Sequence, residues 1–257
     1  MKFNWNPELY DDKHDFVFKF GEEIIKLLNP QKNETILDIG CGTGDLTKKI
    51  AERSEKVIGI DNSGEMIQAA QKKYPEISFI HADAKDFHLD NKFDAIFSNA
   101  VLHWIPQAET MVRNANQLLK IGGRYVVEFG GKGCNYSTLN TLKEQLDKEG
   151  LDYPEIESMI YFPSVSQYTT ILEKNGFEVN LAMLFDRPTE LKGGIDGLRN
   201  FIEMFFNWLF KNVTDSKKST IIERTIEILK PQIFNGTSWI ADYRRIRIVA
   251  YKKFDTK

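Results

Sequence analysis

Three glycines and two carboxylates in the first quarter of the chain have the types and spacing of a nucleotide-binding turn. The glycines are Gly40, Gly42 and Gly44, and Asp38 precedes the first of them by two positions. Asp61 follows roughly twenty residues later, where an acid meets ribose hydroxyls in nucleotide-binding folds. Glycines let the backbone turn sharply and approach a ligand closely, because no Cβ stands in the way. The pattern therefore predicts a nucleotide-like ligand.

The spacing of the glycines separates two kinds of ligand. The dinucleotide fingerprint is G-x-G-x-x-G, which makes room for a pyrophosphate. Residues 40–44 read G-C-G-T-G, a closer spacing, and Asp38 directs a carboxylate into the turn. A carboxylate there suits a ligand with an ammonium group better than a pyrophosphate. The structural alternative is a tight turn without a ligand, since glycines serve both purposes.

The elements that must position these residues alternate between strand and helix. Asp61, Asp83 and Asn99 each stand at the end of an apolar run, and a helical pattern follows the first, second and fourth of the four early runs. After the second run, Ser63 is the expected N-cap of that helix. This repetition predicts a parallel sheet with right-handed crossovers and functional residues at the carboxyl ends of its strands. Strands are expected over residues 36–39, 57–60, 77–83, 93–99, 124–129, 177–185 and 245–253.

Helical patterns flank this core and interrupt its end. An amphipathic helix is expected over residues 16–28, and further helical patterns cover 137–149, 198–210 and 219–230. The last two lie between the sixth and seventh strands, so they form an insertion. One interpretation is a small cap that packs its own apolar stripe. The other is a lid in which Phe205, Phe206 and Trp208 form an apolar wall of the substrate pocket.

Several motifs together resemble those of class I S-adenosylmethionine-dependent methyltransferases: LDIGCGTG, VIGID, HADAKDF, FSNAVLHW and KIGGRYVVEF. The opening WNPELY and the closing IRIVAYKK resemble the trans-aconitate methyltransferase group, so the resemblance covers nearly the whole chain. It implies an α/β fold with a Rossmann-like, seven-stranded, mostly parallel sheet, an antiparallel last strand and helices on both faces. A helical cap insertion between strands 6 and 7 is added to that fold here.

The resemblance also implies a division of the chain. Residues 1–30 are expected to form an N-terminal arm and a helix that cover the cofactor cleft. Residues 31–187 together with 240–257 are expected to form the S-adenosylmethionine-binding domain. Residues 188–239 are expected to form the helical cap.

The implied cofactor is S-adenosylmethionine, and the product is S-adenosylhomocysteine. Asp38 would lie near the amino-acid end, and Asp61 would accept hydrogen bonds from both ribose hydroxyls. Met66 and Asn62 would flank the adenine, and Asp83 would bind its amino group; the alternative for Asp83 is a turn cap. The full set of expected cofactor-binding residues is Asp38, Gly40, Cys41, Gly42, Gly44, Asp61, Asn62, Met66, Asp83, Ala84 and, through its backbone, Asn99.

Few catalytic residues are expected, because methyl transfer from a sulfonium depends on alignment of the reactants and exclusion of water more than on a nucleophile–base triad. His103 and Trp104 would lie beside the reacting centre, as a base or hydrogen-bond donor and as a pocket wall. A carboxylate acceptor needs no base, whereas a hydroxyl or amine acceptor would make His103 the leading candidate. Tyr10 would help to close the site. The alternatives are a packing role for His103 and a surface-docked arm for Tyr10.

Composition excludes several other functions. The 257 residues carry a formal net charge of −3 without a basic stripe, so no nucleic-acid partner is expected. Neither a secretory apolar segment nor a membrane span is apparent, and the two cysteines form no disulfide framework. We therefore expect a cytoplasmic protein that is not bound to a membrane, as a monomer or homodimer. His14, His81 and His88 lack metal-ligand spacing with Cys41 and Cys134, so no metal is expected.

The acceptor is the least constrained part of the prediction. A tricarboxylate would need convergent guanidinium groups, and Arg187, Arg199, Arg244 and Arg245 are candidates that surface solvation would also explain. A small, partly apolar acceptor fits equally well. The leading hypothesis is methyl transfer to a small molecule, as a methyl ester of a carboxylate or onto a hydroxyl or amine. The alternatives are an NAD-dependent dehydrogenase on a similar sheet and a non-catalytic S-adenosylmethionine-binding module.

Overall fold

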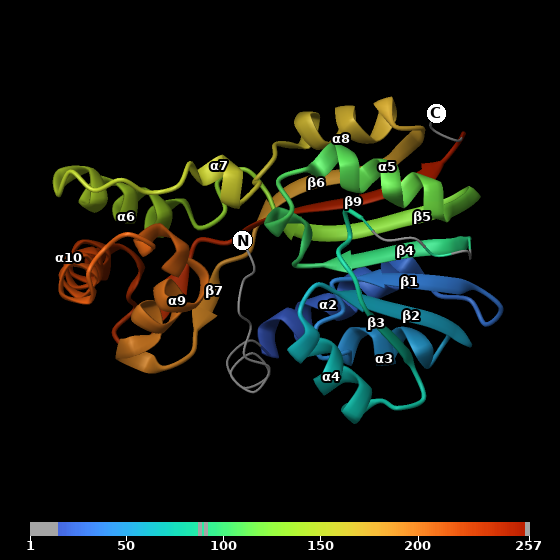
Figure 1. Ribbon diagram of the computed structural model, residues 1–257, viewed down its shortest axis with the longest axis horizontal. Helices are drawn as coiled ribbons and strands as arrows, with labels where there is room; N and C mark the ends of the chain where they lie inside the picture. Colours follow the sequence, from blue (N-terminus) through green and yellow to red (C-terminus); the bar gives the residue numbers. More distant parts are fainter. Residues whose placement is uncertain (1–14, 87–88, 90–91, 255–257) are drawn as a thin grey trace.

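A seven-stranded sheet forms the centre of the computed structural model, which describes residues 15–86, 89 and 92–254 (Figure 1). The strand order is β3-β2-β1-β4-β5-β9-β6, and β9 runs antiparallel to both of its neighbours while the other paired strands run parallel. This confirms the predicted sheet and its antiparallel last strand. The strands are β1 (Thr35–Ile39), β2 (Lys56–Asp61), β3 (Ser78–His81), β4 (Phe93–Asn99), β5 (Leu119–Gly130), β6 (Phe177–Asp186) and β9 (Arg244–Lys252).

Alternation along the strands divides the apolar side chains between two faces. On β9, Ile246 and Ile248 join the core beneath α5 and α8, whereas Val249 joins the core beneath α2. Successive strand residues point to opposite faces, so Arg245 and Arg247 lie on the same face as Val249. Helices therefore cover both faces, as predicted (Figure 1). The flanking helices are α2 (Asp15–Leu28), α3 (Asp45–Ala51), α4 (Gly64–Lys73), α5 (Ala108–Leu118) and α8 (Val165–Lys174).

A second, mainly helical unit lies beside the sheet, and we call it the cap lobe (Figure 1). Leu142 and Leu146 of α6 pack with Ile202, Ile222 and Trp239 of the insertion in one buried core. The predicted division of the chain at residue 188 stays a prediction, and this core includes α6, which lies before that boundary. The elements are α6 (Tyr136–Lys148), α7 (Ile156–Met159), β7 (Thr189–Leu191), η2 (Gly194–Asp196), α9 (Gly197–Phe205), η3 (Asn207–Phe210), α10 (Asp215–Ile233) and β8 (Trp239–Ala241).

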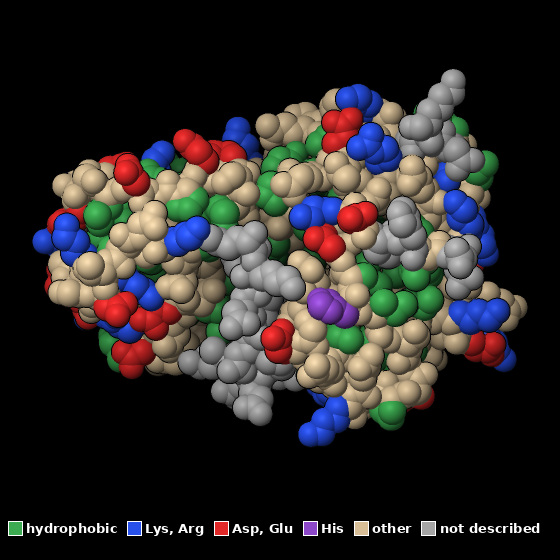
Figure 2. Space-filling view, viewed as in Figure 1, with side chains coloured by type: hydrophobic (Ala, Val, Ile, Leu, Met, Phe, Trp, Pro, Cys, Tyr) green, Lys and Arg blue, Asp and Glu red, His purple; other side chains and the backbone are tan. Residues whose placement is uncertain are grey.

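Charged side chains of both signs are interspersed on the visible surface. Figure 2 shows acidic and basic groups side by side around the cap lobe and along the sheet unit. Mixing of this kind is typical of a solvated surface rather than of a continuous basic stripe. Among the described helices, none has the length and apolarity to cross a membrane.

Candidate cofactor and acceptor site

Three positions of the turn after β1 have a backbone conformation that favours glycine. Gly40, Gly42 and Gly44 have φ angles of 75°, 55° and 88°, a left-handed conformation that residues with a Cβ rarely adopt. A Cβ on Gly40 would lie 2.2 Å from the Val101 side chain, and one on Gly44 would lie 2.7 Å from the Phe79 ring. At Gly40 and Gly44 the backbone is therefore packed too closely on its neighbours to accept a side chain.

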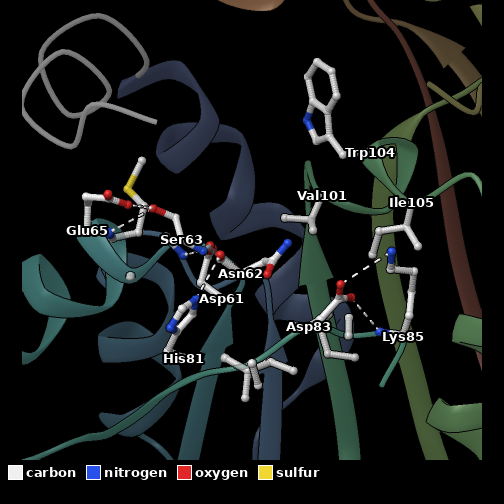
Figure 3. Close-up of a pocket in the computed structure, with 18 of the residues that line it drawn as sticks. Asp61, Asn62, Ser63, Glu65, His81, Asp83, Lys85, Val101, Trp104 and Ile105 are labelled. Atoms are coloured by element: carbon white, nitrogen blue, oxygen red, sulfur yellow. Dashed lines mark hydrogen bonds and ion pairs between the residues drawn. The ribbon is translucent and has the colours of Figure 1, made fainter. Parts of the chain in front are cut away.

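A cavity of about 350 Å³ opens at the carboxyl edge of the sheet, among the loops that follow β1 to β4 (Figure 3). A volume of this size is typical of a small-molecule site. The predicted residues that line it are Gly40, Gly42, Asp61, Asn62, Met66, Asp83, Ala84 and Trp104. The predicted residues that do not line it are Asp38, Cys41, Gly44, Asn99 and His103. Tyr10 lies outside the described residues.

Asp61 is held in place by two neighbouring loops. Its Oδ2 accepts a hydrogen bond from the Gly42 N–H at 3.0 Å, and its Oδ1 accepts one from the Ser63 N–H at 2.8 Å (Figure 3). Burial raises the pKa of Asp61 above its ordinary value, and the backbone hydrogen bonds oppose that rise. Each carboxylate oxygen keeps a second lone pair, so the group can still accept hydrogen bonds from a ligand.

The helix after β2 begins where the sequence predicts and brings Met66 into the cavity. Ser63 caps α4, and its Oγ accepts a hydrogen bond from the Met66 N–H at 3.3 Å. Across the cavity, Asp83 Oδ1 accepts a hydrogen bond from the Lys85 N–H at 3.0 Å, and its Oδ2 lies 3.4 Å from Lys85 Nζ (Figure 3). Asp83 therefore caps a turn and lines the cavity at the same time, so its two predicted roles are compatible.

Several lining residues were not predicted, and Ala100 is the most informative. It follows β4 with a φ of 61°, a conformation that costs energy for a residue with a Cβ. Its N–H donates a hydrogen bond to the Glu128 carbonyl at 2.7 Å, which ties it to β5. No local sequence pattern predicts a strained alanine here, because the strain depends on the hydrogen bond to the neighbouring strand. The other lining residues missed from the sequence include Glu65, His81, Lys85, Val101 and Ile105.

Asp38 is buried behind the glycine turn. The Thr47 hydroxyl donates a hydrogen bond to Asp38 Oδ2 at 2.6 Å. Burial raises the pKa of Asp38 to about 7, and the charge of Asp61 adds to the rise. Two buried acids, Asp38 and Asp61, thus lie near the turn, and the charge of His81 opposes the rise in the pKa of Asp61 only in part. A positively charged group in the ligand would be favoured there.

His103 is buried in the short helix η1 (Leu102–Trp104) rather than in the cavity. Its Nδ1 accepts a hydrogen bond from the Gly130 N–H at 3.3 Å, and its ring stacks on Phe162 at 5.8 Å. Burial, and then the charge of Arg245, lower the pKa of His103 well below its ordinary value. The imidazole is therefore neutral, with its proton on Nε2. Its predicted role as a base stays a prediction.

Trp104 connects the cavity to the cap lobe. It lines the cavity, and its ring stacks on Phe205 of α9 with centroids 6.1 Å apart. Phe206 and Trp208 are buried in the core of the cap lobe, with 1% and 6% of their surface exposed. Phe206 and Trp208 pack inside the cap, as in the first interpretation of the insertion, whereas Phe205 stacks on Trp104. The aromatic wall stays a prediction.

The residues around the cavity fit S-adenosylmethionine on three grounds. Gly40 and Gly42 present backbone without side chains to the cavity, and Asp61 presents an oriented carboxylate for ribose hydroxyls. Met66 and the apolar side chain of Ile105 offer surface to an adenine ring. The buried acid Asp38 lies on the glycine side, where a ligand ammonium group would compensate it.

Comparisons of the sequence point to one enzyme class. A family model described as a methyltransferase domain matches residues 36–123. An uncharacterized methyltransferase of Schizosaccharomyces pombe is 31% identical over 268 aligned positions, which cover 97% of this chain and 98% of that protein. A trans-aconitate 2-methyltransferase of Enterobacter sp. (strain 638) is 28% identical over 69% of this chain and 70% of its own length.

Solved structures show the same fold. An N-methyltransferase from Haemonchus contortus, in complex with S-adenosylhomocysteine, has a TM-score of 0.60 and 17% identity, covering 96% of this chain and 57% of that chain. A geranyl diphosphate C-methyltransferase from Streptomyces coelicolor, also with S-adenosylhomocysteine, has a TM-score of 0.57 and 14% identity. That alignment covers 93% of this chain and 81% of the other. At such identities the likeness concerns the fold alone.

Proposed function

Because the chain belongs to the class I S-adenosylmethionine-dependent methyltransferases, we propose that it methylates a small-molecule acceptor bound between the cofactor cavity and the cap lobe. The predicted family, cofactor and enzyme class are confirmed by the relatives. One observation carries the proposal for the acceptor: Trp104 lines the cavity and also stacks on Phe205 of the cap. An acceptor beside Trp104 would therefore be enclosed by both units.

The side chains at the site would hold and shield the reactants. When bound, S-adenosylmethionine supplies a methyl group made electrophilic by a positively charged sulfur. Asp61 would hold the ribose, and the turn of Gly40 and Gly42 would hold the amino-acid end. Trp104 and Phe205 would exclude water from the acceptor and align it, which supplies most of the rate enhancement that such a displacement needs.

The environment of His103 favours an acceptor that is already a nucleophile. The ring lies outside the cavity lining, its Nδ1 is occupied by the Gly130 N–H, and its pKa is lowered by burial. A carboxylate acceptor is ionised at neutral pH and needs no base, so it fits this site better than a hydroxyl does. We therefore propose methyl ester formation on a carboxylic acid. Nothing in the cavity or among the relatives favours the nicotinamide alternative.

Calorimetry with S-adenosylmethionine and S-adenosylhomocysteine tests the cofactor site. Both ligands should bind with micromolar-range affinity, and Asp61→Ala should weaken binding about 100-fold through the loss of charge-assisted hydrogen bonds. Glu76→Ala is the matched control, because Glu76 pairs with Lys48 on the exposed face of α3 and should leave binding unchanged. Absence of binding of either ligand by the wild-type protein contradicts the proposal.

A methylation screen tests the reaction itself. Carboxylic acids, phenols and amines are incubated with S-adenosylmethionine, and release of S-adenosylhomocysteine is measured. We expect turnover with carboxylic acids. A protein that binds both cofactor forms but turns over no compound of any class would support a non-catalytic binding module instead.

A further inference from the structure

Arg245 is a buried cation next to the proposed acceptor site. Only 4% of its surface is exposed, and its Cα lies opposite Gly130 of β5 and Phe185 of β6 in the sheet register. Gly130 is the residue whose N–H donates to His103. Arg245 is therefore the strand neighbour of a residue that is hydrogen-bonded to η1, the short helix that carries Trp104.

The other arginines between the sheet edge and the cap lobe, which we call the junction, have acidic partners. Arg187 and Arg247 both bind the buried carboxylate of Glu128, with Arg247 Nε 2.6 Å from Glu128 Oε2, and Glu23 lies 3.0 Å from Arg247. A similar exposed pair joins the neighbouring Arg244 to Asp186 at 2.7 Å.

Arg245 forms no ion pair with any residue in the described part of the chain, and its Nε is enclosed without an acceptor. The nearest acid in the sequence, Asp242, directs its Oδ2 to the Ser137 N–H and hydroxyl, each at 2.9 Å. Its Oδ1 is buried without a hydrogen-bond partner and forms no ion pair with Arg245. The guanidinium instead lies over the Tyr243 ring, 4.9 Å from its centroid. A cation–π contact of this kind compensates only part of the desolvation of a buried charge.

A chain of aromatic contacts links this guanidinium to the cavity. Tyr243 meets Phe201 of α9 at 6.0 Å, and Phe201 meets Phe205 at 5.0 Å. Phe205 in turn stacks on Trp104, which lines the cavity. His103 also contacts Trp104 at 4.9 Å. Phe201 and Tyr243 are themselves buried in the core of the cap lobe, so a ligand that reached the guanidinium from the cavity would contact aromatic rings along its body.

We propose that Arg245 binds the carboxylate of the methyl acceptor, and that this acceptor is an apolar monocarboxylate rather than a tricarboxylate. The inference rests on the proposed function. An arginine matches a carboxylate with two parallel hydrogen bonds, which would satisfy the enclosed Nε. One uncompensated cation matches one anionic group, and the surrounding rings match an apolar body. Two further carboxylates would find no described cation at this junction that lacks a partner.

Binding to the protein saturated with S-adenosylhomocysteine tests the inference without requiring turnover. The probes are phenylacetate, octanoate, their neutral amides and citrate, each titrated by calorimetry. We expect the two monocarboxylates to bind more tightly than their amides and than citrate. Arg245→Gln should weaken the monocarboxylates about tenfold to 100-fold and leave the amides within about twofold, because only a charged partner is lost.

The controls separate this inference from folding and from the cofactor site. Arg244→Gln removes the neighbouring, exposed and paired arginine and should leave every affinity unchanged. S-adenosylhomocysteine affinity of Arg245→Gln should equal that of the wild type, and its melting temperature should not fall, because the variant removes a buried charge without an ion-pair partner. Arg245→Lys should restore part of the carboxylate affinity. If S-adenosylhomocysteine binds but no monocarboxylate does, if citrate binds more tightly, or if Arg245→Gln binds as wild type, the inference is wrong while the cofactor site stands. Failure of S-adenosylhomocysteine itself to bind would instead reject the proposed function.

Discussion

The cofactor cavity and the cap junction are assembled from different parts of the chain. Within the described part of the chain, the residues that line the cavity fall between Ile39 and Ile105, at or after the carboxyl ends of four consecutive strands. The junction between the sheet and the cap lobe brings together His103, Phe162, Phe205 and Arg245, which come from segments far apart in the sequence. The cofactor cavity is therefore built locally by one βαβ series, whereas the proposed acceptor site depends on how the cap lobe packs on the sheet.

The two regions also bury charge of opposite sign. Asp38 and Asp61 lie near the glycine turn, and burial raises the pKa of both. At the junction Arg245 is the buried cation without a described acid. A buried charge is costly unless something compensates it, so each region suits a ligand group of the opposite charge. The comparison suggests that the cofactor's positive end and the acceptor's negative end are recognised at separate places.

The largest expected effect is on the free energy of unfolding, and it tests whether Arg187 and Arg247, unlike Arg245, have a structural role at the junction. Glu128→Gln leaves Arg187 and Arg247 without their buried carboxylate and should lower the free energy of unfolding by about 3–5 kcal/mol. The control is Glu178→Gln, whose pair with Lys253 is exposed and should contribute less than about 1 kcal/mol. Urea unfolding measures both. An unchanged midpoint for Glu128→Gln would show that the paired arginines resemble Arg245 after all.

A substitution in the glycine turn tests whether the cofactor cavity depends on close backbone packing at Gly40. Gly40→Ala should lower the free energy of unfolding by about 2–4 kcal/mol and abolish detectable S-adenosylhomocysteine binding, because its Cβ would lie 2.2 Å from Val101 in a left-handed conformation. Gly122→Ala is the matched control: its φ is 78°, but nothing lies within 4 Å of the added Cβ. It should cost only about 1 kcal/mol and leave ligand binding intact. Equal effects of the two variants would argue against close packing at the turn.

The pH dependence of stability tests the buried acid behind the cavity. The folded-state pKa of Asp38 is about 7, above its ordinary value of 3.8, so the folded protein holds this proton more tightly than the unfolded chain. Between about pH 4 and pH 7 this group therefore lowers stability as pH rises, on the order of 4 kcal/mol in total.

Asp38→Asn removes that contribution while its amide oxygen can still accept the Thr47 hydroxyl hydrogen bond. The measurement is urea unfolding of the cofactor-free wild type and variant at intervals from pH 5 to pH 8. The variant should gain stability relative to the wild type as pH rises. A constant difference across that range would show that Asp38 is not the titrating group.

The smallest expected effect tests the role of the cap in acceptor recognition. Phe205→Leu removes the ring that stacks on Trp104 and should raise the acceptor KM about fivefold, since an aromatic pair contributes about 1 kcal/mol. S-adenosylhomocysteine affinity should not change. Phe206→Leu is the control, because Phe206 packs inside the cap and should lower the melting temperature without a specific change in KM. The reverse pattern would remove Phe205 from the acceptor site.

Much of the cofactor site could be predicted because its geometry follows from chain order. The strands, the helix cap at Ser63 and the cavity position of Asp61 all depend on short segments, and parallel strands bring their carboxyl ends to one edge. The strained Ala100 could not be predicted, since its conformation depends on a hydrogen bond to Glu128. The sequence also could not show that Phe205 contacts Trp104 while Phe206 packs inside the cap. Both residues are apolar, and their spacing along the helix does not show which of them contacts the sheet unit.

The amino-acid sequence alone therefore determined the sheet and the glycine turn, because both rest on local spacing, backbone conformation and strand order. The identity of the cofactor came from the resemblance of the sequence motifs to a known family, whereas the spacing itself indicated only a nucleotide-like ligand with a positively charged group. Only the tertiary structure decided that α6 packs in the same core as the insertion and that Glu128 neutralises two arginines while Arg245 keeps no described acid. Partners for a charge are chosen among residues brought together by packing, and no spacing along the chain encodes that choice.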